Sequence, residues 1–253
     1  MKFGLFNGVW LMAAGVFLLS GCSGLPQRSP ASSSNIPSGM TADASHLHWS
    51  PTDQVKWEPV LFPGKSPTEY QTEVLGSRTT LVARAHSSVS MLRKPLRIEP
   101  SQLGSVRFSW LIPQLIANAD MGDRASDDSP VRLVLAFEGD RSAFSLKNAM
   151  LNELALTLTG EEMPYATLMY VWCNRRPVGS VVHNNRTDRI RQLVVESGST
   201  GLQQWRDYER NIRADYEKAF GEAPGALVGI AVMTDSDNTK STVLAHYGDI
   251  SLR

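Results

Sequence analysis

The sequence predicts an antiparallel β-sandwich that carries two helices, and three observations lead to this fold class. Short runs of β-favouring residues recur from about residue 55 onward, and turn-forming residues separate them. The runs do not alternate with helices, as the strands of a parallel α/β fold would. A chain of 253 residues with 42% hydrophobic side chains is also long enough to bury a sizeable core.

Seven strands are predicted along the chain. Ser105–Ile112 has the clearest alternation, with Phe108 and Trp110 on one face and Arg107 on the other. Two of the runs, Val131–Phe137 and Leu227–Thr234, are almost continuously apolar, which is typical of strands covered on both faces. In chain order the predicted strands are Thr79–Ala85, Ser105–Ile112, Val131–Phe137, Ala166–Trp172, Ile190–Glu196, Leu227–Thr234 and Val243–Leu252.

Two amphipathic helices are predicted to interrupt the strands, at about 146–159 and 202–220. Ser145 can cap the first helix and Gly160 can end it, with a leucine stripe expected on its buried face. In the second, apolar residues recur at helical spacing, and Gly221 marks the end. The stripe residues are Leu151, Leu154 and Leu158 in the first helix, and Trp205, Tyr208, Ile212, Tyr216 and Phe220 in the second.

The first 22 residues carry the strongest local signal. Lys2 precedes an apolar stretch that ends in Leu19-Ser-Gly-Cys22, and this pattern resembles a bacterial lipoprotein signal peptide. The resemblance implies cleavage before Cys22 and acylation of that cysteine, palmitate included, which anchors the chain in a lipid membrane. Ser23 at the next position favours the outer membrane, facing the periplasm. A transmembrane anchor and an ordinary secretory peptide cut elsewhere remain as alternatives.

The predicted organisation has three parts: a signal peptide at 1–21, lipidated Cys22 with a tether at 22–52, and one β-sandwich domain at 53–253. The tether is rich in serine and proline and almost uncharged, so it cannot bury enough apolar surface to offset its ordering entropy. As a coil it spans roughly 30 Å on average. With Cys22 committed to lipid, Cys173 has no disulfide partner, and a buried thiol is its simplest interpretation.

Several stretches of the chain also resemble a bacterial envelope family that is defined only as a domain of unknown function. The resemblance implies a secreted, jelly-roll-like sandwich similar to galactose-binding and other carbohydrate-binding domains, without a proven activity. Cys173 stands where this family often has Asp after Val-Trp, so any ligand contact of that Asp is lost or altered here. The matching stretches are Trp57 with Pro63-Gly-Lys65 and Pro67-Thr68, Arg84–Ser90, Met163–Trp172, Trp205–Gly221 and Met233–Ile250.

Common catalytic signatures are absent from the sequence. It contains no Gly-x-Ser-x-Gly, His-Glu-x-x-His, P-loop or Gly-x-Gly-x-x-Gly pattern. Two carboxylates from distant strands can still meet in space, as in glycosidases. The formal net charge of zero argues against a nucleic-acid partner. Enzymatic activity is therefore left open, with a non-catalytic protein favoured.

Two acidic segments are candidates for polar contacts. Asp235-Ser-Asp-Asn-Thr239 lies between two predicted strands, and the oxygens of Asp235 and Asp237 suit Ca²⁺. The alternative is a structural turn, because Asp and Asn side chains also bond their own backbone. Asp120–Asp128 forms a second acidic loop, interpreted either as a solvated surface loop or as a cation or ligand loop.

The candidate ligand-binding residues combine aromatic and polar side chains. Tyr170 and Trp172 share one face of a strand, and Arg84 lies in another strand. With Asp237 and Asn238, these residues are predicted to bind a glycan if that face is open to solvent. If it faces the second sheet instead, the two aromatic residues belong to the core.

Three functions follow from these features. The favoured one is a membrane-anchored periplasmic lipoprotein whose domain binds a glycan or another envelope polymer. The second is a structural or protein-interaction lipoprotein without a small ligand, which a large apolar patch would favour. The third is a polysaccharide hydrolase, which two carboxylates facing each other across a cleft would favour.

Overall fold

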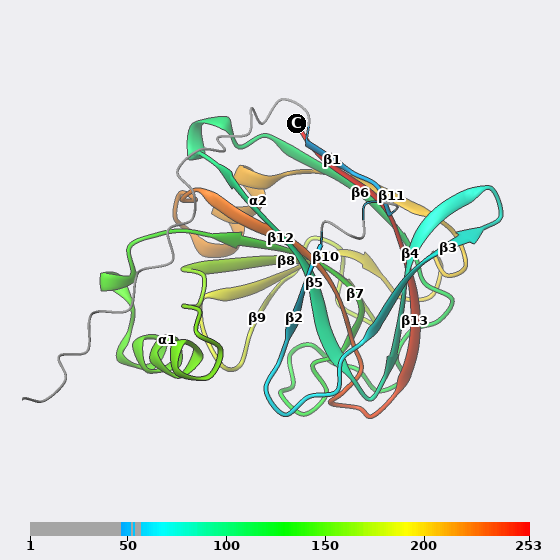
Figure 1. Ribbon diagram of the computed structural model, residues 1–253, viewed down its shortest axis with the longest axis horizontal. Coiled ribbons are helices and arrows are strands. Elements are labelled where there is room, and N and C mark those ends of the chain that lie inside the picture. Colours follow the sequence, from blue (N-terminus) through cyan, green and yellow to red (C-terminus); the bar gives the residue numbers. More distant parts are fainter. Residues whose placement is uncertain (1–46, 52, 54–56) are drawn as a thin grey trace, which may run out of the picture. The chain divides into compact units, whose positions relative to one another are not determined.

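The computed structural model describes residues 47–51, 53 and 57–253, which form two β-sheets with a shared core (Figure 1). The smaller sheet has the order β11 (Arg206–Asn211), β6 (Ser105–Leu111), β13 (Thr242–Leu252), β4 (Arg78–His86) and β3 (Glu69–Leu75), with β1 (Leu47–Trp49) also paired to β13. The larger sheet has the order β2 (Glu58–Leu61), β5 (Val89–Ile98), β12 (Leu227–Asp235), β7 (Ser129–Phe137), β8 (Ala166–Cys173), β10 (Ile190–Ser197) and β9 (Val181–His183).

This architecture confirms the predicted mainly β, jelly-roll-like sandwich, and all seven predicted strands are present. One pair departs from the antiparallel pattern, since β10 runs parallel to β8 with Leu193 opposite Tyr170. The chain returns from β8 through a long connection and the short strand β9, and this crossover makes the parallel direction possible.

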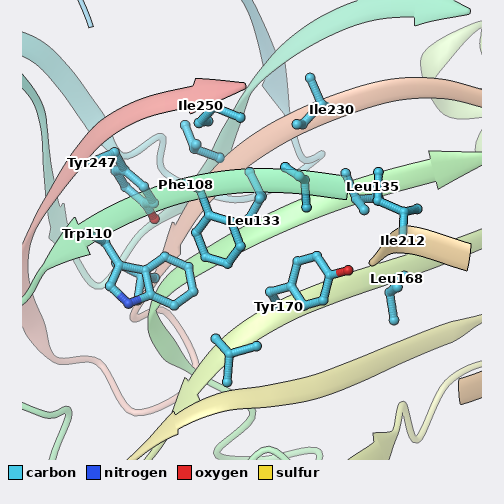
Figure 2. Packing of buried hydrophobic residues seen from close by; sticks show 14 of the residues in the cluster. Phe108, Trp110, Leu133, Leu135, Leu168, Tyr170, Ile212, Ile230, Tyr247 and Ile250 are labelled. Carbon is cyan, nitrogen blue, oxygen red and sulfur yellow. The ribbon is translucent and has the colours of Figure 1, made fainter. Parts of the chain in front are cut away.

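The core lies between the two sheets and is rich in aromatic side chains (Figure 2). Phe108 and Trp110 of β6 point into it, as the alternation of Ser105–Ile112 predicts. The Phe108 ring stacks on Tyr170 from the opposite sheet, with ring centroids 5.5 Å apart. Such offset aromatic pairs stabilise a core beyond the area they bury.

The first predicted helix is confirmed as α1 (Leu146–Thr159), but the side that it buries is the opposite of the predicted one. Ser145 Oγ accepts the backbone N–H of Asn148 at 3.3 Å, and Gly160 ends the helix with φ +76°. The buried residues of α1 are Asn148 and Asn152, whereas Leu154 and Leu158 are exposed. The leucine stripe therefore does not contribute to the core.

The second predicted helix is wrong in its first half, because residues 206–211 form the edge strand β11 and only α2 (Ile212–Phe220) is helical. Tyr208 pairs with Phe108 across the strands and stacks on its ring, with centroids 5.1 Å apart. That cross-strand contact outweighs the local helical spacing of the aromatic residues. Asn211 is extended (ψ 110°) and marks the change from strand to helix.

Asn211 provides the N-cap of α2, and its removal is expected to be measurable. Its Oδ1 accepts the backbone N–H of Ala214 at 2.9 Å. We expect Asn211→Ala to lower the free energy of unfolding by about 1 kcal/mol, the usual cost of losing such a cap. Urea denaturation measures this loss, and Asn211→Asp serves as a control because it retains an acceptor. Equal losses in both variants would contradict the capping role.

The structure also moves the N-terminal boundary of the domain. β1 lies within the segment predicted as a tether, and Leu47 pairs with Leu252 of β13. The sandwich domain therefore begins by Leu47, because this short strand gains its hydrogen bonds from β13. Cys22, the predicted signal peptide and the tether up to residue 46 lie outside the described residues. Within the described ranges, no helix is long and apolar enough to cross a membrane.

Candidate functional site

The side chains that point away from the core form two rows across the larger sheet. The first row contains Val60, Met91, Met233, Arg132, Val171 and Val194, in strand order. The second row contains Glu58, Arg93, Ala231, Val134, Met169 and Gln192. We call these two rows the outer face. It is mainly aliphatic and methionine-rich, with few polar residues. Glu58 is exposed and Val60, Met91, Arg93 and Met169 are partly exposed, whereas the other seven residues of the two rows are buried.

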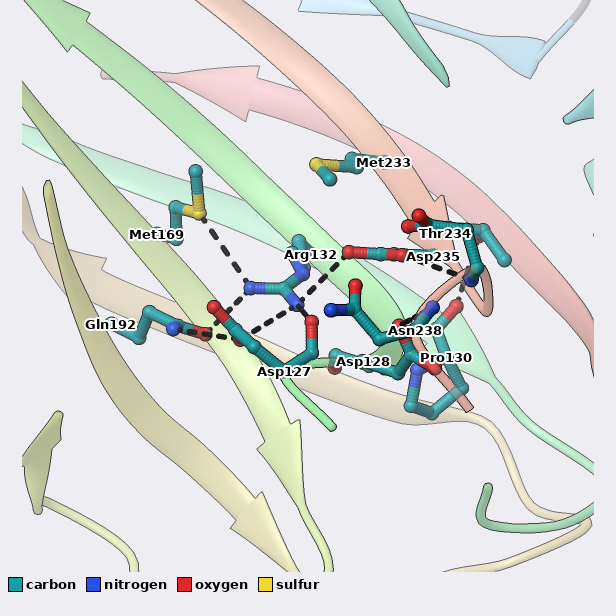
Figure 3. Close-up of polar contacts among 12 residues, drawn as sticks. Asp127, Asp128, Pro130, Arg132, Met169, Gln192, Met233, Thr234, Asp235 and Asn238 are labelled. Carbon is teal, nitrogen blue, oxygen red and sulfur yellow. Dashed lines mark hydrogen bonds and ion pairs between the residues drawn. The ribbon is translucent and has the colours of Figure 1, made fainter. Parts of the chain in front are cut away.

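Arg132 of β7 is the centre of the polar contacts on the outer face (Figure 3). Its Nη1 donates to Gln192 Oε1 at 2.6 Å. Its Nη2 lies 3.2 Å from Asp127 Oδ1 and 3.3 Å from Asp235 Oδ2. Gln192 Nε2 also donates to Asp127 Oδ1, at 3.2 Å. We call these four residues the Arg132 cluster, and they join β7, β10 and β12 with the loop before β7.

The charges of this cluster are held in a buried setting, since the Arg132 side chain is only 3% exposed. Burial alone would lower the pKa of Arg132, but the carboxylates of Asp127 and Asp235 outweigh it and raise the pKa above its ordinary value. Burial raises the pKa of Asp235 well above its ordinary value, opposed by Arg132 and reinforced by nearby Asp128. Arg132 thus stays charged, while Asp235 holds its proton more tightly than an exposed carboxyl.

The two acidic segments identified in the sequence meet beside the Arg132 cluster. Asp128 Oδ2 accepts the backbone N–H of Thr239 at 2.7 Å and its hydroxyl at 2.5 Å. Asp128 Oδ1 accepts the backbone N–H of Asn238 at 3.1 Å. One carboxylate from the Asp120–Asp128 loop therefore fixes the turn at Asp235–Thr239, which supports the structural-turn interpretation.

A possible cation site lies at the same junction. Asp128, Asp235 and Asp237 each place one carboxylate oxygen within 4.8 Å of the others, and such oxygens suit Ca²⁺. The three carboxylates already have partners, however. Lys65 Nζ is paired with Asp237, Arg132 with Asp235, and the backbone of the turn with Asp128. The negative charge that would attract a metal ion is therefore largely compensated by the chain itself.

Two buried donors on the outer face lack a hydrogen-bond partner among the residues that the structure describes. They are the Nε atoms of Arg93 and Arg132, one in each row. Buried polar groups are almost always paired in folded proteins, so these two donors are unusual. Of the two, only Arg93 belongs to a side chain that is partly exposed, at 32%.

The structure places the predicted aromatic residues in the core. Tyr170 and Trp172 alternate with outward-facing residues of β8, and both are fully buried between the sheets. The Tyr170 hydroxyl donates to Asp215 Oδ2 at 3.0 Å, and Trp172 Nε1 donates to the Gly198 carbonyl at 2.9 Å. The prediction that these rings form a glycan platform is thus corrected, since their face of β8 is covered by the other sheet.

The other predicted ligand residues are separated from one another. Arg84 lies on the outer side of the smaller sheet, where its Nη1 is 2.7 Å from Glu73 Oε1. The hydrogen bond from Arg84 lowers the pKa of Glu73. Asp237 and Asn238 lie beyond the end of β12, where Asn238 Nδ2 donates to the Arg124 carbonyl at 2.8 Å. Of the predicted residues that the structure describes, Asp235 belongs to the Arg132 cluster, and Asp237 and Asn238 lie next to it. Cys22 is outside the described residues.

Sequence reasoning missed Arg132 and Gln192. The available signal was a charged residue inside the apolar run Val131–Phe137, which had been interpreted as a strand covered on both faces. An arginine at that position requires a partner within reach, and the acidic residues just before the strand were the nearest ones. Gln192 gave no comparable signal, because glutamine is common on the exposed side of strands.

These observations define a jelly-roll-like β-sandwich domain with a polar cluster on the outer face of its larger sheet. The chain belongs to the family described as "Protein of unknown function (DUF3047)", which matches residues 55–251. No match was found among curated proteins.

Solved structures with a similar arrangement include three glycan-related proteins. A low-affinity xylan-binding module, CBM86 of Roseburia intestinalis, is 12% identical, with 82% of this chain and 94% of that chain covered and a TM-score of 0.32. The xyloglucanase domain of NopAA from Sinorhizobium fredii is 10% identical, with 76% and 90% covered and a TM-score of 0.39. A cellulase derived from Cel12A of Rhodothermus marinus is 12% identical, with 83% and 97% covered and a TM-score of 0.34.

Proposed function

We propose that the protein is a lipid-anchored component of the bacterial cell envelope whose β-sandwich domain binds a glycan, or another envelope polymer, without cleaving it. The anchor is the acylated Cys22, in the outer membrane facing the periplasm. The binding site is the outer face of the larger sheet. The observation that carries this assignment is the guanidinium of Arg93, which lies next to the partly exposed Met91 and whose Nε lacks a hydrogen-bond partner among the described residues.

The chemistry of the outer face matches the two kinds of surface that a sugar presents. Sugar rings offer C–H groups, which pack against apolar side chains such as the partly exposed Met91 and Met169. Sugar hydroxyls accept and donate hydrogen bonds, which the guanidinium of Arg93 and the carboxylate of Asp127 can complete. The partly exposed side chain of Arg93, at 32%, is the most accessible of these polar groups.

A non-catalytic role is favoured over hydrolysis by the position of the carboxylates. Asp127 and Asp235 contact the same Nη2 atom of Arg132, so they face a shared cation instead of an open cleft. A glycosidase needs its two carboxyl groups on opposite sides of the scissile bond. With its side chain 7% exposed, Asp235 is also poorly placed to meet a substrate.

The binding site is tested with the full chain by a thermal-shift screen against envelope and plant-type glycans. A ligand present at 100 times its dissociation constant stabilises a protein by about 2.7 kcal/mol, a readable shift. We expect Arg93→Gln to abolish the shift and Arg84→Gln to preserve it. The two arginines form a matched pair, because each is about one-third exposed and bound to a glutamate.

The outcomes of this screen separate the candidate functions. Loss of the shift in Arg84→Gln alone would place the site on the smaller sheet and refute our assignment. No shift with any glycan would favour the protein-interaction alternative. A shift with Ca²⁺ that EDTA reverses would assign a metal site to Asp128, Asp235 and Asp237. The anchor is tested separately, since labelled palmitate should be incorporated by the natural chain and not by the Cys22→Ala variant.

A further inference from the structure

The helix α1 presents an apolar row to the solvent. Leu146, Met150, Leu154 and Leu158 follow one another at intervals of four residues, so they lie along one side of the helix. Their exposures are 79%, 65%, 53% and 58%, respectively. Scattered exposed leucines need no explanation, whereas a continuous exposed row along a helix is a candidate contact surface. We call these four residues the α1 row.

The opposite side of α1 is fixed to the domain by polar contacts. Asn148 Nδ2 donates to Asp188 Oδ1 at 2.5 Å, and its Oδ1 accepts the Thr187 hydroxyl at 2.8 Å. Asn152 Oδ1 accepts the backbone N–H of Met163 at 2.9 Å. A surface helix normally buries its apolar side and exposes its polar side. In α1 this order is reversed, so the leucines are not needed to hold the helix in place.

The size of the α1 row argues against a second copy of the chain as its partner. A helix of 14 residues is roughly 21 Å long and 10 Å wide, so its side offers a footprint of only about 200 Å². A specific protein interface needs about 800 Å² per partner. A contact that another attachment already holds in place needs much less area, because the second binding event is intramolecular.

The proposed anchor supplies such an attachment. The tether predicted from the sequence separates Cys22 from β1, and its predicted span is roughly 30 Å. The domain is thereby kept within reach of the bilayer that holds the acyl chains. The α1 row contains only aliphatic and methionine side chains, which suit the boundary between lipid headgroups and acyl chains. The neighbouring exposed charges, Lys147 and Glu153, are opposite in sign, so the surface does not require an anionic lipid.

From these contacts we propose that α1 is a membrane-contact helix, which lays its apolar row on the lipid surface next to the anchor. This inference rests on the proposed anchoring at Cys22. The contact fixes the orientation of the domain on the membrane and adds little to its attachment. Because Glu161, just beyond α1, pairs with Arg93 of the outer face, the helix and the candidate glycan site are held together as one unit.

The test uses the full chain reconstituted into phosphatidylcholine vesicles that contain a nitroxide-labelled quencher lipid. A fluorophore is attached at Leu154→Cys, or at Val74→Cys as the control. Val74 lies at the end of β3, is 71% exposed and is also apolar. Cys173 is buried and the sulfur of Cys22 is blocked in the lipidated chain, so labelling is limited to the new cysteine. We expect the Leu154 label to lose roughly half or more of its fluorescence, because interfacial helices enter the bilayer by about 5–10 Å. The Val74 label should lose little.

Flotation of the vesicles separates failure of the anchor from failure of the inference. If the chain floats and the Leu154 label is quenched no more than the Val74 label, the anchor stands and the membrane-contact helix is refuted. If the chain does not float, the anchor is refuted and the helix contact with it. A Leu158→Cys label in a Met150→Asp, Leu154→Asp background provides a further check, since these exposed substitutions should remove the quenching without unfolding the domain.

Discussion

Trp172→Ala is expected to lower the free energy of unfolding by about 3–5 kcal/mol, the usual loss when a buried tryptophan is truncated. Its side chain is fully buried, and its indole N–H is bonded to the Gly198 carbonyl, so the substitution leaves both a cavity and a buried acceptor without its partner. Urea denaturation at neutral pH measures the loss. The result tests the assignment of Trp172 to the core.

Trp205→Ala is the matched control for this experiment. Trp205 is partly exposed, and its ring lies 4.0 Å from the guanidinium carbon of Arg78. Such an exposed cation–π contact contributes about 0.5–1 kcal/mol, so this variant should remain close to the natural protein in stability. A stable Trp172→Ala variant that has lost its glycan-induced thermal shift would restore the platform interpretation.

Arg132→Leu is expected to cost about 3–5 kcal/mol at neutral pH, the typical result of removing one partner from a buried charged network. The substitution leaves the buried Asp235 carboxylate without its cation and removes the donor to Gln192 Oε1. Arg97→Leu is the control, because Arg97 contacts Glu99 and Glu138 at 44% exposure. Exposed ion pairs of this kind contribute at most about 1 kcal/mol.

The loss in Arg132→Leu should also depend on pH. The pKa of Asp235 is already raised in the folded state, and removing Arg132 takes away the group that opposes the rise. A carboxyl with a raised folded pKa contributes stability at low pH, and this stability is lost as the pH rises through the folded pKa. The loss in free energy of unfolding that Arg132→Leu causes relative to the natural protein should therefore be smaller at pH 4–5 than at pH 7. A deficit that is constant with pH would show that the charges of the cluster do not determine its cost.

The strands were predictable because alternation and turn residues are local properties of the sequence. Phe108 and Trp110 could be assigned to one face from their spacing alone, and the structure buries both. The first half of the second helix failed for the opposite reason, because the local spacing of Trp205, Tyr208 and Ile212 favours a helix over the strand that forms. Only the neighbouring strand β6, far away in sequence, decides between them by pairing with β11.

The candidate site was less predictable than the fold, since it depends on which strands become neighbours. Arg132 and Gln192 meet because β8 brings β7 and β10 to either side of itself, and no local pattern contains that order. Tyr170 and Trp172 could be placed together on one face, but period-two alternation does not say whether that face is the inner one. The side of α1 that is buried could not be predicted for the same reason. A leucine stripe predicts that the leucines are buried, but in α1 the asparagines on the opposite side find hydrogen-bond partners in the domain and are buried instead.

The position of β13 has a consequence for how the protein is made. β13 pairs with β4 and β6 in the middle of the smaller sheet, yet it follows every other described strand in the sequence. β4 pairs with β13, for example at Ala83 and Ala245, so it has no partner on that side until β13 has been synthesised. The smaller sheet therefore cannot be completed before synthesis has passed Leu252. Pairings this distant in sequence also form slowly. The smaller sheet of the sandwich therefore assembles only after all the other described strands have been synthesised.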